Sequence, residues 1–261
     1  VGILHFNQHT SYSTDEAMHM FSQSLHLYRS CESPNLVSIA TVLNNIGRVY
    51  YLRSEFKDAL MIYEESLQLR KQLLGKDSVD VAATMYNIGQ TCHQLGRLDE
   101  LLAHYADFLK IARSAFGPNN SRDVVLVYKG IAEIYHERSD HKMALSYLTQ
   151  ALDTQRASRG GQFSKSVATT LNKLGNICYE MKDYTSAMRH YQEELYVERA
   201  VLPPNHPHII VTLTNIAHIY KQLGERTKGL MTYKKVRKIQ EEKSECQEGD
   251  SIQIAETLSS I

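Results

Sequence analysis

Residues 43–74 read LNNIGRVYYLRSEFKDALMIYEESLQLRKQLL, and the rest of the chain consists of variations on this stretch. Apolar and aromatic residues recur within it at intervals of about one or two helical turns, in a first run that ends at Phe56 and a second run that starts at Ala59. This spacing is typical of amphipathic helices. Ser54 and Glu55 separate the two runs and indicate a short turn. We therefore expect this stretch to form a helical hairpin.

The same pattern returns along the chain with a period of 42 or 43 residues. In the second helix of the hairpin, the small residue Ala59 is matched by Ala17, Leu101, Ala144, Ala187 and Gly229. In the first helix, the pair Ile46–Gly47 is matched by Ile88–Gly89, Ile131–Ala132, Leu174–Gly175 and Ile216–Ala217. A fixed period of this length is the signature of a repeat architecture. The sequence therefore predicts an all-α array of antiparallel helix pairs, with about six hairpins and the start of a seventh.

The repeats divide the chain into segments of a single array. We expect these segments at residues 1–34 (partial), 36–77, 78–119, 121–160, 163–204, 208–246 and 250–261. Gly75 and Gly117 lie where a helix C-cap favours a residue that tolerates positive φ. The last segment resembles Ile39–Ile46, so it is expected to start a further repeat or to form a capping helix. On this pattern the chain is expected to be part of a longer array.

Composition excludes several classes of function. Lys and Arg together number 29, as do Asp and Glu, so the chain lacks the basic excess typical of nucleic-acid binding. No apolar run is long enough to suggest membrane insertion. Of the four cysteines, Cys92 and Cys178 take the place of tyrosines in other repeats and are expected to pack in the core. Free cysteines favour a reducing, cytoplasmic location, and a disulfide or zinc site is the less favoured alternative.

Two features resemble the tetratricopeptide repeat, or TPR. These are the Ile/Leu–Gly/Ala pair before an aromatic residue and an aromatic residue four places after a small one, as in Ala59 and Tyr63. The long period is similar to that of kinesin light chain, as are the segments LNNIG (43–47), YNIG (86–89), TNIA (214–217), LLGKDSVDVA (73–82) and LPPNHPHII (202–210). The resemblance implies a right-handed superhelical solenoid whose first helices line a concave groove. It also implies a non-catalytic adaptor that binds a protein or peptide partner.

We expect the groove residues to flank the packing pair of each first helix. The candidates are Asn44, Asn45, Arg48, Asn87, Gln90, His93, Lys129, His136, Asn172, Lys173, Asn176, Asn215, His218 and Lys221. An asparagine amide can both donate to and accept from a peptide backbone. The charged candidates are positive, with Glu133 as a negative neighbour, which favours an acidic peptide. The alternative is that these are solvated residues, with asparagines that make contacts between repeats.

An enzymatic function has little support in the sequence. His93, His136 and His218 occur one per repeat, so we expect neither a catalytic triad nor a metal site. Gly160 and Gly161 lack the surrounding motif of a phosphate-binding loop. We therefore predict no catalytic residues, no metal and no cofactor. The alternative function is a structural scaffold or oligomerisation segment of a larger multidomain protein. Self-association would be favoured by an exposed apolar patch on the second helices.

Overall fold

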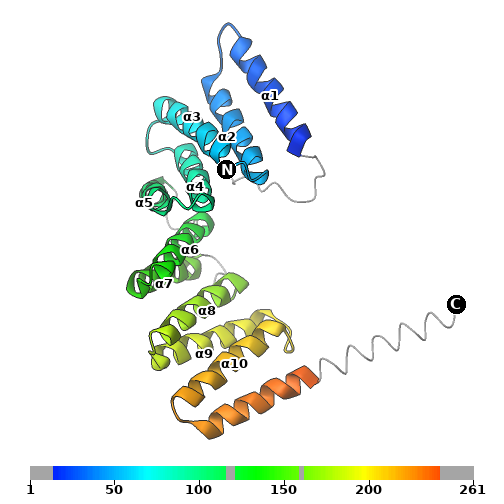
Figure 1. Cartoon of the computed structure of the whole chain (residues 1–261), viewed down its shortest axis with the longest axis vertical. Helices are drawn as coiled ribbons and strands as arrows, with labels where there is room; N and C mark the ends of the chain where they lie inside the picture. The colour runs from blue at the N-terminus through cyan, green and yellow to red at the C-terminus, as the bar shows by residue number, and fades with distance from the viewer. Residues whose placement is uncertain (1–13, 116–120, 159–161, 242–261) are drawn as a thin grey trace, which may run out of the picture. The chain divides into compact units, whose positions relative to one another are not determined.

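The computed structural model describes residues 14–115, 121–158 and 162–241, and every regular element in them is an α-helix (Figure 1). The helices are α1 (Thr14–Ser30), α2 (Leu36–Leu52), α3 (Phe56–Leu74), α4 (Val79–Gln94), α5 (Leu98–Ala115), α6 (Ser121–Glu137), α7 (His141–Ala157), α8 (Lys165–Glu180), α9 (Tyr184–Val201) and α10 (Pro207–Gln222). Residues 226–241 form a further helix. These helices confirm the predicted all-α array of antiparallel pairs.

The chain forms two compact units, residues 1–120 (unit 1) and residues 121–261 (unit 2). In unit 1, α2 packs against α1 and α3, and α4 packs against α3 and α5. In unit 2, α6 to α10 pack successively, each against the next. The predicted start of a further repeat, at residues 250–261, lies outside the described residues. Each of the described helices is too short or too polar to cross a lipid bilayer.

Polar residues fix the start of many helices. A side-chain oxygen of the residue before the helix accepts a hydrogen bond from a backbone N–H of the first turn, which otherwise has no partner. Asparagine, serine and aspartate act in this way at Asn35, Ser78, Asp140, Ser164 and Asp183. These caps start the first helices α2, α4 and α8 and the second helices α7 and α9.

The turn inside each described hairpin contains one residue with positive φ. The φ angle at this position lies between 60° and 77° at Ser54, Gly96, Ser139, Lys182 and Gly224. The turn predicted near Ser54 is confirmed. Glycine adopts this conformation freely, whereas serine and lysine adopt it at a cost of about 1 kcal/mol. Gly75, with φ of 82°, caps the end of α3 as predicted, and Gly117 lies outside the described residues.

Glycine and tyrosine pack together where the two helices of a hairpin meet. A methyl group added at Gly47 would lie 2.8 Å from ring carbons of Tyr63, and one added at Gly175 would lie 2.6 Å from Tyr191. The rings therefore fill the space that a side chain would occupy. In α6 the glycine is replaced by Ala132, and the buried residue facing it from α7 is Leu148 instead of tyrosine. Thus, where alanine replaces glycine in the first helix, the smaller leucine replaces tyrosine in the second helix.

Buried hydrogen bonds join one hairpin to the next at three equivalent places, which we call the junction pairs. In each pair a fully buried threonine of a first helix bonds a buried side chain of the preceding second helix. The pairs are Arg70–Thr84 at 2.8 Å, Gln155–Thr170 at 2.9 Å and Glu198–Thr212 at 2.8 Å. The corresponding residues of α5 and α6 are Ala112 and Val127, which have no polar side-chain atoms.

The cysteine prediction is confirmed for the core. Cys92 and Cys178 are buried free thiols, and Cys31 is an exposed one. Burial raises the pKa of the Cys92 and Cys178 thiols, and nearby carboxylates raise it further. Because the thiolate is the reactive form, both residues are packing groups. Cys246 lies outside the described residues.

The last described hairpin offers a test of how glycine affects a helix interior. Gly229 stands where most repeats have alanine, and a methyl group there would meet only ordinary contacts, the closest at 3.4 Å from the Ala217 carbonyl oxygen. Gly229→Ala is expected to stabilise the chain by about 1 kcal/mol, because alanine loses less conformational entropy in a helix than glycine. Urea denaturation followed by circular dichroism measures this change. A loss of stability would show that the position is sterically filled.

Candidate functional site

Two adjoining cavities lie along the first helices α6, α8 and α10 of unit 2. The first has a volume of about 230 Å³ and is lined by Ala132, Glu133, His136, Leu148, Lys173, Asn176, Ile177 and Glu180. The second has a volume of about 170 Å³ and is lined by Asn176, Tyr179, Glu180, Tyr191, Asn215 and His218. The cavities share the lining residues Asn176 and Glu180, so they adjoin along α8, and we call them together the α6–α10 groove. Five of the predicted residues line it: His136, Lys173, Asn176, Asn215 and His218.

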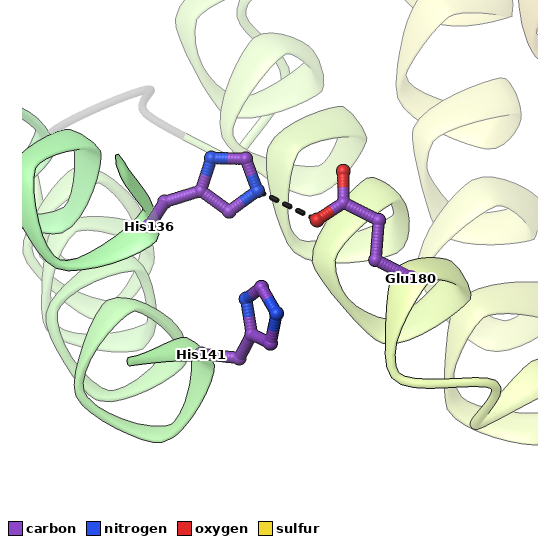
Figure 2. Close-up of side chains that lie close together, drawn as sticks. All are labelled: His136, His141 and Glu180. Carbon is purple, nitrogen blue, oxygen red and sulfur yellow. Dashed lines mark hydrogen bonds and ion pairs between the residues drawn. The ribbon is translucent and has the colours of Figure 1, made fainter. Parts of the chain in front are cut away.

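Charged side chains are paired along the first cavity. Lys173 of α8 forms an ion pair with Glu133 of α6. His136 Nε2 lies 2.7 Å from Glu180 Oε2, as Figure 2 shows. Both pairs connect α6 to α8, and all four side chains are at least one-third exposed. The groove wall therefore presents basic and acidic groups side by side.

Asn176 is held in place by a polar network beneath the groove. Its Oδ1 accepts a hydrogen bond of 2.6 Å from the Tyr191 hydroxyl, and its Nδ2 donates to Asn172 Oδ1 at 3.2 Å. Asn172 in turn donates to Glu194 at 3.2 Å. Burial raises the pKa of Tyr191, and it raises the pKa of Glu194 to about 8. Because an amide has two N–H donors and two acceptor lone pairs, Asn176 retains bonding capacity for a ligand.

Three further predicted residues of unit 2 lie away from the floor of the groove or act on it indirectly. Lys129 is half-buried and donates to the Ser166 carbonyl oxygen at 3.3 Å. Its pKa is lowered to about 8, mainly by burial and then by the positive charge of Lys173, while Glu133 acts in the opposite direction. Asn172 supports Asn176, as described above, and Lys221 is exposed near the end of α10.

Two of the predicted residues of unit 1 are bonded to each other. Asn87 Nδ2 of α4 donates to Asn44 Oδ1 of α2 at 3.1 Å, so these amides join two successive first helices. Gln90 donates to the hydroxyl of Tyr86, its neighbour on the same helix, at 3.1 Å. Asn45 and Arg48 are half-buried, and His93 is exposed. The contact between Asn44 and Asn87 joins two repeats, as in the alternative interpretation, in which the asparagines make contacts between repeats and do not bind a ligand.

Glu180 and Tyr191 line the α6–α10 groove but were not among the residues predicted for it. Glu180 lies one helical turn after Asn176 on the same face of α8, and this spacing could have revealed it. Tyr191 occupies a position that the repeat pattern assigns to the core. Its ring is buried there as expected, but its hydroxyl reaches Asn176. The repeat pattern locates a ring and gives no information about the polar atom at its end.

Solved structures similar to this chain share its fold. BtubC (BKLC) from P. vanneervenii has a TM-score of 0.66 and 19% identity, over 89% of this chain and 93% of that protein. A putative kinesin light chain from Podospora anserina, with nearly identical TPR-like repeats, has a TM-score of 0.62 and 15% identity, over 80% and 97%. MamA has a TM-score of 0.58 and 16% identity, over 79% and 94%. These likenesses include kinesin-light-chain-like proteins, as predicted.

No curated protein sequence matches the chain significantly. The family model that describes the tetratricopeptide repeat matches residues 13–72, 38–114, 80–157 and 166–242, which together span most of the sequence. The match agrees with the helix pairs, the small-residue positions and the turns described above. The chain belongs to the tetratricopeptide repeat family.

Proposed function

We propose that unit 2 binds a peptide segment of a protein partner in the α6–α10 groove. Tetratricopeptide repeat domains generally mediate protein–protein interactions and are typically non-catalytic. The observation that carries the proposal is that two cavities adjoin along α8 and share Asn176 and Glu180 in their linings. Asn176, oriented by Tyr191, supplies hydrogen bonds to the peptide backbone. The partner in this proposal is a protein, and no reaction takes place in the groove.

The charges at one end of the groove favour an acidic segment. Lys129 and Lys173 are close enough for the charge of one to lower the pKa of the other, and Glu133 is paired with Lys173. A peptide carboxylate placed near both lysines would reduce their mutual repulsion and speed the encounter. We therefore assign the recognition of an acidic side chain to Lys173, with Lys129 beside it.

The groove is tested with short fluorescein-labelled peptides rich in Glu and Asp, titrated with the protein while fluorescence anisotropy is measured. Submillimolar binding that weakens with added salt is expected, because exposed charge pairs are screened. Lys173→Gln and Asn176→Ala are each expected to weaken binding about tenfold, equivalent to about 1.4 kcal/mol. Lys142→Gln, which removes the charge of an exposed lysine on α7, is the matched control and should leave the affinity unchanged.

Two results would contradict the groove proposal. Peptides that bind the Lys173→Gln and Asn176→Ala variants as tightly as the parent protein would place the binding site elsewhere. Equal affinity for Lys-rich peptides of the same length would contradict the preference for acidic segments and leave the groove itself in place. The two parts of the proposal can therefore fail separately.

A structural scaffold is the second candidate function, and exposed apolar side chains favour it. Leu230 and Met231, in the helix at residues 226–241, are 58% and 62% exposed, and Met61 of α3 is 60% exposed. Large apolar side chains on second helices are suited to contacts with another chain. Sedimentation at several protein concentrations distinguishes the candidates. A mass that rises with concentration, together with an absence of acidic-peptide binding, would favour the scaffold.

A further inference from the structure

Two histidines and a glutamate from three helices converge at the first cavity of the α6–α10 groove, which His136 and Glu180 line. His136 lies in the last turn of α6, His141 is the first residue of α7, and Glu180 is the last residue of α8. Figure 2 shows the three side chains pointing toward one another. One potential ligand atom from each lies within 4.8 Å of the other two. The histidines are half-buried and the glutamate is exposed, so a small ion can enter from solvent.

The equivalent positions in another repeat show how this cluster differs from ordinary packing. In unit 1 they are occupied by Tyr51, Phe56 and Gln94. The rings of Tyr51 and Phe56 pack edge to face at 5.4 Å, and Tyr51 is hydrogen-bonded to Gln94. The rings of His136 and His141 are separated by a similar 5.6 Å. Thus an aromatic pair and an amide are replaced, at the same three positions, by two imidazoles and a carboxylate.

We propose that His136, His141 and Glu180 bind a divalent transition-metal ion of the Zn²⁺ type. Two imidazole nitrogens and one carboxylate oxygen form a common donor set for zinc, with water at the fourth position. The ligand atoms around tetrahedral zinc lie about 3.3 Å apart. Rotation of half-exposed side chains is sufficient to bring the three ligand atoms to that spacing. His136 then exchanges its hydrogen bond with Glu180 for a shared bond to the metal.

A second observation supports this assignment. Nδ1 of His141 is buried and has no hydrogen-bond partner within the described part of the chain. A buried polar atom without a partner is uncommon in folded proteins and calls for an explanation such as an ion. Coordination of the metal through His141 Nδ1 would supply that interaction. The metal site does not depend on the proposed peptide binding, because it is inferred only from the proximity of its three side chains.

The test is a titration of metal-free protein with ZnCl₂ by isothermal titration calorimetry. Cysteine thiols also bind zinc, so the protein carries Cys31→Ser and Cys246→Ser. We expect about one high-affinity site per chain, and Zn²⁺ should raise the melting temperature because it binds only the folded chain. The triple variant His136→Tyr, His141→Phe and Glu180→Gln copies the residues of the unit 1 repeat. It should fold and bind Zn²⁺ about a hundredfold more weakly or less.

The matched control is His93→Tyr, which removes the exposed histidine that occupies the register of His136 in α4. This variant should bind Zn²⁺ like the parent. If the triple variant is unfolded by circular dichroism, Glu180→Gln alone serves as the test, with an expected loss of about tenfold. Absence of a zinc site in the parent protein would overturn the proposal. So would an affinity that is unchanged in these variants, or one that falls as far in His93→Tyr.

Discussion

Glu194→Gln is expected to stabilise unit 2 by on the order of 3 kcal/mol at pH 8.5, since it removes a carboxyl group that the folded chain cannot easily ionise. The Glu194 side chain is only 4% exposed, on the face of α9 that meets α8. Its pKa is raised from 4.5 to about 8. Burial is the main cause and the charge of Glu198 acts in the same direction, whereas the hydrogen bond from Asn172 lowers the pKa. Glutamine keeps the shape and the acceptor oxygen without the charge.

The pH dependence follows from the direction of this shift. Between pH 4.5 and about 8 the folded chain retains a proton that the unfolded chain releases. The contribution of Glu194 to stability is therefore complete below pH 4.5 and is lost as the pH rises through about 8. Urea denaturation at several pH values should show a flatter profile for Glu194→Gln than for the parent. Glu137→Gln, at an exposed position of α6, is the control. Parallel profiles for parent and variant would show that Glu194 is ionised in the folded state.

Gly89→Ala is expected to destabilise unit 1 by about 2 kcal/mol. The added methyl group would meet the ring of Tyr105 at less than the 3.0 Å that real Cβ atoms maintain. Tyr105 is buried and stacks on Tyr86, so its ring cannot move without disturbing the core. Overpacking of this kind costs about 3 kcal/mol, and the better helix propensity of alanine recovers about 1 kcal/mol.

A double-mutant cycle tests the cause of this loss. The pair Ala132 and Leu148 already combines a methyl group with a smaller partner at the same place in unit 2. Tyr105→Leu should therefore remove the clash but not the gain in helix propensity, so the coupling free energy with Gly89→Ala should be about 3 kcal/mol. Gly229→Ala provides the contrasting substitution, because its methyl group would make only ordinary van der Waals contacts. Additive effects in the cycle would show that the ring and the methyl group do not meet.

Periodicity alone could predict the helices, their pairing and most of the core. Small residues such as Gly47 mark where two helices approach, and the polar links mark helix starts, because both are local requirements of packing and backbone hydrogen bonding. The positive φ at Ser54, Ser139 and Lys182 was less visible, since these residues, unlike glycine, do not signal that conformation.

The candidate site was predictable only in part, because a repeat indicates which face a residue lies on and leaves its bonding partner open. Asn215 and Asn87 occupy matching positions, yet one lines the α6–α10 groove and the other bonds Asn44. The cluster of His136, His141 and Glu180 draws one residue from each of three helices. Its assembly depends on how neighbouring hairpins stack and on side-chain rotamers, which the spacing of residues in a sequence does not specify.

The junction pairs affect which hairpins of such a chain can be exchanged or duplicated. Threonine is neutral and its hydroxyl both donates and accepts, so Thr84 accepts from a cation while Thr170 and Thr212 donate to an amide and an acid. The hairpin whose second helix carries Arg70 could thus be joined to the hairpin whose first helix carries Thr170, and these two residues would still form a hydrogen bond. The hairpin whose second helix carries Ala112 is the exception, because the threonine of the hairpin joined to it would be bonded only within its own helix. Shuffling or duplication of hairpins is therefore compatible with three of the four second helices, those that carry Arg70, Gln155 and Glu198.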